Sequence, residues 1–366
     1  MAGQLTVDLG ERSYEIYCGS GLLPRTGFYL HTLDLAAPCL VVSNATVAGL
    51  YWPAIEISLK EAGFQPHLAL VPDGEEAKSL EVAAGLYNAA LDAGIERRAA
   101  VIALGGGVAG DVAGFIAATW LRGVPFIQIP TTILAQVDSS VGGKVAVNHP
   151  KGKNLIGAFY QPRMVLADTD ALTTLPPREI RAGLAEVIKY GVIADAGFFA
   201  YLEEHLDQAL RGDRGVLESI ILRCCALKAK VVAGDEREKG LRAILNFGHT
   251  VGHAVEAVTG FNTYRHGEAV AMGMVAAARM AVQRGMFSAA ETGRLVRLLE
   301  RAGLPVTMPA LDPAAFRAAL GHDKKIAWGQ LRMILPERLG RVQITPIAVE
   351  EIMAVLGLGN PGAKEG

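Results

Sequence analysis

Residues 246–273, NFGHTVGHAVEAVTGFNTYRHGEAVAMG, hold three of the eight histidines in the chain. His249 and His253 are four residues apart, so both would lie on one face of a helix and could share a metal ion, while His266 could come back from the next helix. The spacing therefore favours His249 and His253 as a ligand pair. The alternative for each histidine taken alone is a hydrogen-bonded core residue.

A carboxylate ligand for that ion would have to come from another part of the chain. The segment GLAEVIKYG, residues 183–191, offers Glu186 on an otherwise apolar helix. Burying a charge in such a place is costly unless a partner compensates it. Three histidines together with this glutamate outweigh the core-residue alternative and predict a metal site.

A glycine-rich segment, ALGGGVAGDVAGF at residues 103–115, follows a predicted strand and opens a predicted helix. Gly105, Gly107 and Gly110 fit the spacing G-x-G-x-x-G, which lets backbone amides approach a pyrophosphate at the positive end of the helix. The alternative is a glycine turn that only packs a helix closely on a sheet. No phosphate-binding G-x-x-x-x-G-K-[ST] loop competes with this segment.

Polar side chains gather in residues 129–162, a region that is otherwise apolar and rich in glycine. They include hydroxyls, amides and lysines, namely Thr131, Thr132, Asp138, Ser139, Ser140, Lys144, Lys151, Lys153 and Asn154. Lysines beside hydroxyls and amides suit a phosphate or carboxylate ligand. A solvated loop with ordinary surface lysines explains this stretch equally well.

The elements that would position these residues change in kind along the chain. Short β-branched runs at residues 39–44, 67–73, 99–105, 125–130 and 164–169 alternate with helical stretches such as 79–95. This alternation predicts βαβ units and a parallel sheet. After the Pro176–Pro177 pair, the sequence predicts helices at residues 177–193, 217–233, 248–258, 267–284 and 289–301.

Composition excludes several classes of protein. A formal net charge of −2 gives no basic field, so a nucleic-acid partner is not expected. Residues 99–121 are apolar enough to raise a membrane-spanning alternative, but Asp111 and three consecutive glycines favour a strand, a turn and a buried helix. The N-terminus lacks the pattern of a secretory signal, and the four cysteines show no CxxC spacing. We therefore expect a cytoplasmic protein with reduced thiols.

Several longer strings make the chain recognisable. GDVAGF, PTT-x5-DSSVGGK, KNLIGAFYQP, TLPxRE-x3-GLAEVIKYG, DEREKGLRAILNFGHTVGHAVE, HGEAVAMGM and HDKK together resemble the 3-dehydroquinate synthases, within the superfamily of sugar-phosphate cyclases. The resemblance covers about residues 40–340. It implies an α/β Rossmann-like nucleotide-binding domain at residues 1–176 and an all-α, metal- and substrate-binding domain at residues 177–366.

The resemblance revises the metal ligands suggested by spacing. The zinc ligands of the family fall on Glu186, His249 and His266, whereas His253 would lie beside the substrate and assist proton transfer. Cobalt could replace zinc. The implied reaction turns 3-deoxy-D-arabino-heptulosonate 7-phosphate into 3-dehydroquinate and phosphate, and bound NAD takes a hydride and returns it within one cycle.

The substrate contacts implied by the resemblance carry charges that suit the ligand. They are Asp138, Lys144, Asn154, Lys189, Lys228, Arg242, Asn246, His253 and Lys325, or Lys324 beside it. Arg242 and that lysine would face the carboxylate, and Lys144, Asn154 and Lys189 would surround the phosphate. Arg122 resembles a residue that the family lends across a dimer interface, so a homodimer is expected.

The positions that match the NAD site of the family lie mainly after predicted strands. They are Asn44, Asp73, Gly74, Glu75, Lys78, Gly106, Gly107, Gly110, Asp111, Thr131, Thr132, Lys144, Lys153, Leu172, Thr173 and Thr174. Asn44 would meet the adenosine ribose, although it departs from the pattern, because an acidic residue commonly stands at or beside that place.

Three other functions remain as alternatives. One is another sugar-phosphate cyclase, such as a 2-deoxy-scyllo-inosose or sedoheptulose phosphate cyclase. The substrate of such an enzyme has no carboxylate to pair with Arg242 and the lysine at 324 or 325. A metal-dependent polyol dehydrogenase would accumulate NADH. A nucleotide-binding protein without catalysis would release no phosphate.

Overall fold

The computed structural model describes residues 2–238, 240–321, 326–327 and 330–358. The chain forms two compact units, Met1–Pro176 with Gly212–Arg237, and Pro177–Arg211 with Glu238–Gly366. Residues 212–237 thus belong with the first unit, whereas the sequence-based division assigned all of residues 177–366 to the second domain. The difference arises because the helix in this segment packs on strands of the first unit.

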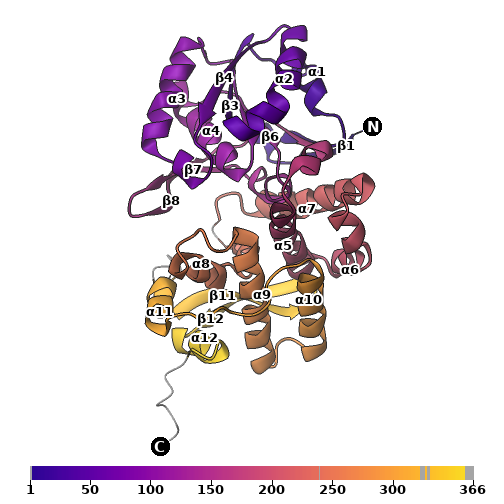
Figure 1. Ribbon diagram of the computed structural model, residues 1–366, viewed down its shortest axis with the longest axis vertical. Helices are drawn as coiled ribbons and strands as arrows, with labels where there is room; N and C mark the ends of the chain where they lie inside the picture. Colours follow the sequence, from indigo (N-terminus) through magenta and orange to yellow (C-terminus); the bar gives the residue numbers. More distant parts are fainter. Residues whose placement is uncertain (1, 239, 322–325, 328–329, 359–366) are drawn as a thin grey trace, which may run out of the picture. The chain divides into compact units, whose positions relative to one another are not determined.

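The first unit is built on a seven-stranded sheet (Figure 1). Its strands, in spatial order, are β1 (Gly3–Val7), β2 (Tyr14–Gly19), β9 (Met164–Asp168), β6 (Phe126–Pro130), β5 (Ala100–Gly105), β3 (Pro38–Asn44) and β4 (Gln65–Val71). β1 and β2 pair antiparallel, and all other neighbours pair parallel. The five predicted strands and the parallel sheet are confirmed, and the β1–β2 hairpin is an addition.

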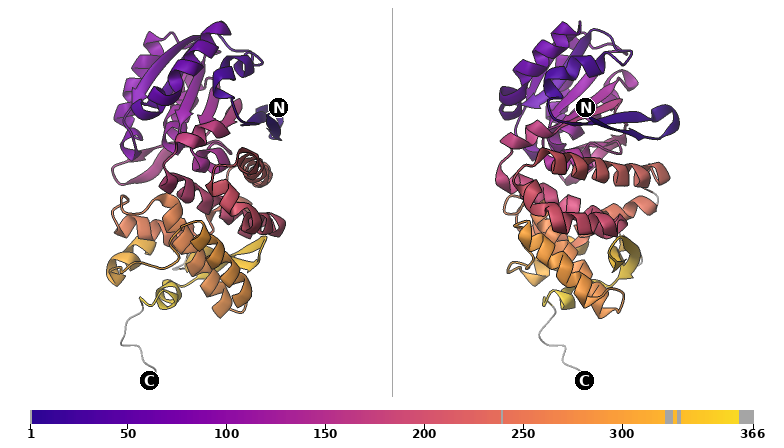
Figure 2. Two further views of the ribbon diagram at one scale, coloured as in Figure 1. Left: turned by 45° about the vertical axis from the view of Figure 1, so that its right-hand side comes forward. Right: turned by 90° about the vertical axis from the view of Figure 1, so that its right-hand side faces the viewer.

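Helices cover both faces of this sheet, as Figure 2 shows. Alternate residues of one strand enter opposite cores: Leu40 and Val42 pack with α3 (Leu80–Asp92) and α4 (Gly107–Thr119). Val41 packs on the other face with α1 (Thr26–Leu30) and α2 (Ala45–Glu61). Because both faces are buried, the central strands read as continuous apolar runs.

The order of the strands identifies the edge of the sheet where a ligand would bind. From β3 the chain continues to β4 on one side, while β5, β6 and β9 follow on the other side. Open parallel sheets bind ligands outside the carboxyl ends of the strands, where this order reverses. Asn44 ends β3 and Gly105 ends β5, so the reversal lies between two of the predicted nucleotide-binding segments.

A carboxylate at the end of β9 holds a loop of the first unit in place by hydrogen bonds. Asp168 is 1% exposed, and its two oxygens accept hydrogen bonds from the backbone amides of Gly21, Leu22, Leu23 and Asp170 at 2.7–3.1 Å. Asp168→Ala should lower the free energy of unfolding by about 3 kcal/mol, because buried amides lose their acceptor.

Urea unfolding followed by circular dichroism measures that loss. Asp34 is the matched control, since its side chain is 87% exposed and pairs only at the surface with Arg98. Asp34→Ala should change stability by less than about 1 kcal/mol. Equal stability of the two variants would contradict the role assigned to Asp168.

Two further elements of the first unit carry predicted site residues. The hairpin of β7 (Lys144–His149) and β8 (Gly152–Phe159) forms a separate antiparallel pair, and β7 packs on α4. Helix α7 (Arg214–Gly234) packs on β1, β2 and the π-helical turn η5 (Ala135–Ser139). The amide of Gly3 donates to Glu218 of α7 at 3.2 Å.

The second unit is largely helical but contains a small sheet. Its helices are α5 (Pro177–Ala194), α6 (Ala196–Leu210), α8 (His249–Val258), α9 (His266–Gln283), α10 (Ala289–Arg301), α11 (Pro313–Gly321) and α12 (Val349–Val355). Strands β10 (Ile326–Ala327), β11 (Gln330–Arg338) and β12 (Arg341–Ile347) pair antiparallel. The expectation of an all-α domain therefore missed this sheet, which packs against α9 (Figure 1).

Glycines set how closely the helices of the second unit approach. A Cβ atom added to Gly267 would lie 1.8 Å from the carbonyl oxygen of Ala182, and one added to Gly273 would lie 1.9 Å from that of Gly248. Helix α9 thus meets both α5 and the start of α8 at positions where only glycine fits. These contacts fix the relative placement of the three helices that carry the predicted metal ligands.

Among the described residues, no helix combines the length and the apolar character that crossing a bilayer requires. Residues 99–121, which raised that alternative, form β5 followed by α4 and a short turn.

Candidate functional site

One buried carboxylate lies on helix α5 of the second unit. Glu186 and Lys189 are three residues apart on α5, so their side chains lie on one face, and each is 1% exposed. Oε2 of Glu186 is paired with Nζ of Lys189. Its other oxygen, Oε1, is buried and accepts no hydrogen bond from the described part of the chain.

Two imidazoles face that second oxygen. Nε2 of His249, at the start of α8, and Nε2 of His266, at the start of α9, each lie 3.6 Å from Oε1 of Glu186. Nδ1 of His249 lies 3.1 Å from the carbonyl oxygen of Phe247, and Nδ1 of His266 lies 3.3 Å from Oε2 of Glu256. Both rings therefore turn the same nitrogen toward the carboxylate.

This arrangement fits a divalent metal ion. Ligand atoms about 2.1 Å from a tetrahedral ion lie roughly 3.4 Å apart, close to the separation of Oε1 from each Nε2. A buried oxygen without a hydrogen bond would cost stability, and a cation beside it would satisfy it. Two histidines, one glutamate and open positions are the donor set of a catalytic zinc site.

Electrostatics at the site set the three groups apart. Burial by itself would raise the pKa of Glu186, but Lys189, His249 and His266 hold that pKa well below its ordinary value. Burial lowers the pKa of His249 well below its usual range, against the opposing effect of Glu186. Burial also acts against His266, but its contacts with Glu186 and Glu256 outweigh burial and raise its pKa to about 10.

His253 belongs to the same cluster from a more exposed position. Ligand atoms of His249, His253 and His266 all lie within 4.8 Å of one another. The ring centroids of His249 and His253 are 5.3 Å apart, and those of His253 and His266 are 5.8 Å apart. The structure thus brings together all three histidines and the glutamate that the sequence singled out.

The predicted nucleotide residues of the first unit follow the carboxyl ends of its parallel strands. Asn44 caps α2 by accepting from the amide of Val47, and its Nδ2 donates to Asp73 at 2.8 Å. Both ends of this amide are thus engaged, and Asp73 is an acidic side chain that lies beside Asn44.

The glycines of the first unit have different tasks. Gly106 precedes α4 and no side chain caps the helix there, so its first amides point to the carboxyl edge of the sheet. A Cβ atom on Gly110 would lie 2.8 Å from Gln128 on β6. Gly110 therefore serves close packing of helix on sheet, which is the role of the third glycine in dinucleotide-binding turns.

Lys78 connects several predicted residues. It is 4% exposed, and its Nζ contacts Oδ2 of Asp111 at 2.6 Å and also donates to Oδ1 of Asn154. Glu75 lies 3.8 Å from the same ammonium. Burial raises the pKa of Asp111 above its ordinary value, although the neighbouring Lys78 opposes that rise. A residue absent from the prediction, Asn148, joins this group by accepting from the amide of Asn154.

A second pair in the first unit depends on α7. Nζ of Lys228 contacts both Oδ1 and the main-chain oxygen of Asp138, at 2.9 and 2.6 Å. Lys228 is 5% exposed. The assignment of α7 to the first unit is therefore also what places this predicted lysine beside its predicted aspartate.

The remaining predicted residues are spread over both units. Thr131 and Thr132 follow β6, Leu172–Thr174 lie in the turn η6 (Thr169–Thr174), and Lys144 and Lys153 lie on the hairpin. Arg242 is 2% exposed, and Asn246 donates to Glu238 at 3.3 Å. Lys324 and Lys325 lie outside the described residues. Glu238 and Glu256 were missed, because neither stands at a spacing that singles it out.

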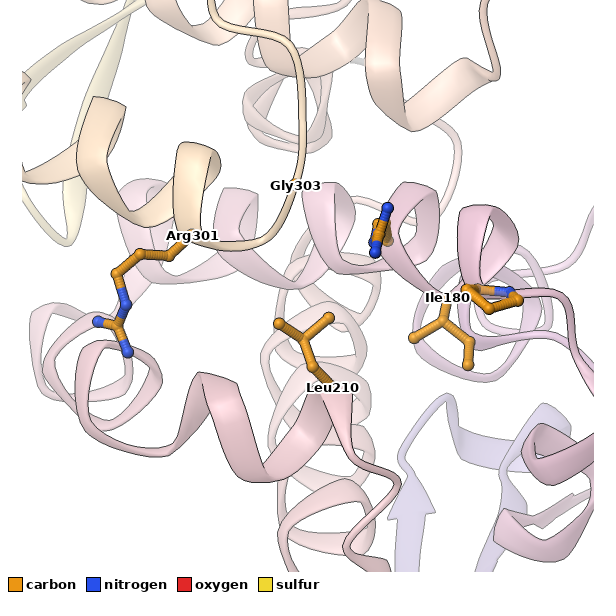
Figure 3. A pocket seen from close by; sticks show the side chains of 6 residues that line it. Ile180, Leu210, Arg301 and Gly303 are labelled. Atoms are coloured by element: carbon orange, nitrogen blue, oxygen red, sulfur yellow. The ribbon is translucent and has the colours of Figure 1, made fainter.

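A hollow of about 280 Å³ in the second unit contains none of the predicted residues (Figure 3). It is lined by Pro177, Ile180, Arg181, Leu210, Arg301 and Gly303. The guanidinium of Arg301 already donates hydrogen bonds to the carbonyl oxygen of Glu203 and to the carboxylate of Asp207. The residues that line this hollow are thus separate from the histidine cluster.

Models of two protein domains match consecutive parts of the chain. The model described as 3-dehydroquinate synthase N-terminal matches residues 68–182, and the one described as 3-dehydroquinate synthase C-terminal matches residues 183–326. Together they cover well over half of the chain.

Individual relatives agree with these matches. A 3-dehydroquinate synthase from Desulforamulus reducens is 54% identical over 97% of this chain and 99% of its own length. Two solved structures are similar over nearly their whole length. The first is 2-deoxy-scyllo-inosose synthase with carbaglucose-6-phosphate, NAD+ and Co2+, at a TM-score of 0.89 and 31% identity over 98% of this chain and 100% of the other. The second is 2-epi-5-epi-valiolone synthase from Streptomyces hygroscopicus with NAD+ and Zn2+, at a TM-score of 0.87 and 30% identity over 95% and 97%. From its domains, its near relatives and its fold, this chain belongs to the 3-dehydroquinate synthase family.

Proposed function

We propose how this chain carries out the reaction of its family, in which 3-deoxy-D-arabino-heptulosonate 7-phosphate becomes 3-dehydroquinate and phosphate. The observation that carries the proposal is the buried Oε1 of Glu186, which faces Nε2 of His249 and of His266 at 3.6 Å. These three residues are the proposed metal ligands. When bound there, a zinc or cobalt ion would polarise the oxygen of the substrate hydroxyl that NAD oxidises, and the same oxygen in the ketone that results.

The first unit is proposed to hold NAD at the carboxyl edge of its sheet. The uncapped start of α4 at Gly106 and Gly107 would receive the pyrophosphate, and Asp73 would accept from an adenosine ribose hydroxyl. NAD supplies a hydride acceptor that is regenerated in each cycle. Lys78, held by Asp111 and Asn154, would keep the surrounding loops in register. The other proposed contacts are Gly74, Glu75, Gly110, Thr131, Thr132, Lys144, Lys153, Leu172, Thr173 and Thr174.

A set of cations and hydrogen-bonding side chains is proposed to bind the substrate. Arg242 and Lys325 would pair with its carboxylate, and Lys144, Asn154 and Lys189 with its phosphate. Asp138, Lys228 and Asn246 would hold its hydroxyls. His253, which is more exposed than the other two histidines of the cluster, would move a proton.

The proposed working form is a cytoplasmic homodimer in which Arg122 is lent to the partner. Backbone geometry supports a special role for this residue: Leu121, Arg122 and Gly123 have φ values of 49°, 69° and 124°. Two consecutive residues other than glycine rarely adopt such angles, and the cost is tolerated mainly where function requires it. Light scattering from the purified protein tests the dimer.

The activity itself is tested by incubating the protein with the heptulosonate phosphate, NAD and a divalent zinc salt. Phosphate and dehydroquinate should appear in equal amounts while NADH does not accumulate, because each cycle returns its hydride. Steady NADH production from a simple polyol would instead support a dehydrogenase. Turnover of a hexose 6-phosphate without the carboxylate, and none of the heptulosonate, would support another cyclase.

A further inference from the structure

A second carboxylate lies on the outer side of the metal-facing histidine His266. Glu256, on the last turn of α8, places Oε2 3.3 Å from Nδ1 of His266. Its side chain is 12% exposed, compared with 32% for His266. The contact joins two helices across the loop between them, so it is not a consequence of neighbouring positions on one helix.

The other metal-facing histidine shows what such a contact does. Nδ1 of His249 lies 3.1 Å from the carbonyl oxygen of Phe247, which can only accept a hydrogen bond. The proton of the neutral ring must then sit on Nδ1, and the lone pair of Nε2 faces Glu186. An ionised carboxylate is also only an acceptor, so Glu256 imposes the same orientation on His266.

The main chain places both partners of this contact. The amide of Phe261 donates to the carbonyl oxygen of Glu256 at 2.8 Å, just beyond the end of α8 at Val258. At the start of α9, Glu268 accepts from the amide of Arg265 and from the guanidinium of Arg178. The ring of His266 and its acceptor are thus held from two sides, independently of each other.

We propose that Glu256 is a positioning residue of the metal site, which keeps the proton of His266 on Nδ1 and directs Nε2 toward the ion. The inference rests on the proposed ligand set Glu186, His249 and His266. Acceptors behind a ligating histidine fix its tautomer and raise its strength as a donor, and their loss typically costs about 10- to 100-fold in metal affinity. The competing interpretation is that Glu256 only stabilises the loop between α8 and α9.

Zinc affinity measured by competition with a chromophoric chelator tests the proposal. Glu256→Gln keeps the shape and a neutral acceptor, so it should bind zinc about 10-fold more weakly, and Glu256→Ala about 100-fold more weakly. Glu300→Gln is the matched control, because it removes one charge from an exposed position of α10. It should bind zinc like the unchanged protein.

Two further measurements separate positioning from loop stability. In the zinc-loaded protein the Nδ1 proton of His266 should give a slowly exchanging NMR signal, which Glu256→Ala should lose and Glu256→Gln should keep in part. Unchanged affinity in Glu256→Gln, or an unchanged signal in a folded Glu256→Ala, would overturn the proposal. His266→Ala that keeps its zinc would instead overturn the ligand set, so the two failures can be told apart.

Discussion

Glu186→Gln should lose the divalent ion and the synthase activity together. The change replaces an anionic ligand by a neutral amide and leaves the ammonium of Lys189, 1% exposed, without its carboxylate. That ammonium would repel a metal ion bound beside it at His249 and His266. We expect turnover to fall by about 1,000-fold or more, since the transition state would lose its Lewis acid. Metal analysis of the purified variant beside the phosphate-release assay measures both effects.

Variants of the histidines act as controls for that result. His266→Ala removes a ligand without disturbing the pair of Glu186 and Lys189, and it should also be metal-free. His253→Ala should keep its metal and lose about 100- to 10,000-fold in rate, because only a proton-transfer group is removed. A metal-free His253→Ala together with a loaded His266→Ala would restore the ligand pair that spacing alone suggested.

Gly267→Ala should weaken the whole second unit although it adds a single methyl group. The new Cβ atom would lie 1.8 Å from the carbonyl oxygen of Ala182, and neither backbone can give way within a helix. Helices α5 and α9 would have to separate, which moves Glu186 away from His266. We expect the free energy of unfolding to fall by about 3 kcal/mol, and zinc affinity to fall with it. Denaturant unfolding and chelator competition measure the two effects.

The chain offers a matched glycine for comparison. Gly85 lies inside α3, and an added Cβ atom would meet nothing within 4 Å. Gly85→Ala should therefore raise stability by about 0.5–1 kcal/mol, as expected for glycine in an exposed helix. If Gly267→Ala proved as stable as Gly85→Ala, the close approach of α5 and α9 would not be the constraint described here.

The parallel sheet and most helices could be predicted from the sequence because their signals are local. Four of the five predicted strands, β3, β5, β6 and β9, are apolar runs buried on both faces, and such runs are readable without knowing their neighbours. Helices at residues 177–193 and 289–301 also agree with α5 and α10 nearly to the residue. Their apolar residues recur with the helical period.

The features that were missed depend on partners distant in sequence. The hairpin of β7 and β8 lies in the polar stretch that a ligand site and a solvated loop explain equally well, and only its pairing makes it regular. The antiparallel pair of β11 and β12 turns at Leu339 and Gly340. The sequence predicted only helices in this half of the chain, so that turn was missed. The periodic pattern of α7 predicted a helix but carried no information on which unit it packs against.

The candidate site was found from the sequence in its residues more than in its geometry. Histidine spacing led to His249 and His253, whereas in the structure Oε1 of Glu186 faces Nε2 of His249 and of His266. The resemblance to known cyclases implies that set, and the variants above test it directly. Glu256 gave no signal, because its contact with His266 arises only when the two helices meet.

The path of the backbone between the units has a consequence for how the protein is made. Helix α7 completes the first unit, yet the ribosome must first synthesise residues 177–211, which belong to the second. The nascent first unit therefore leaves β1 uncovered until that helix emerges. A gene truncated after codon 176 would encode a sheet that lacks this cover and should yield insoluble material.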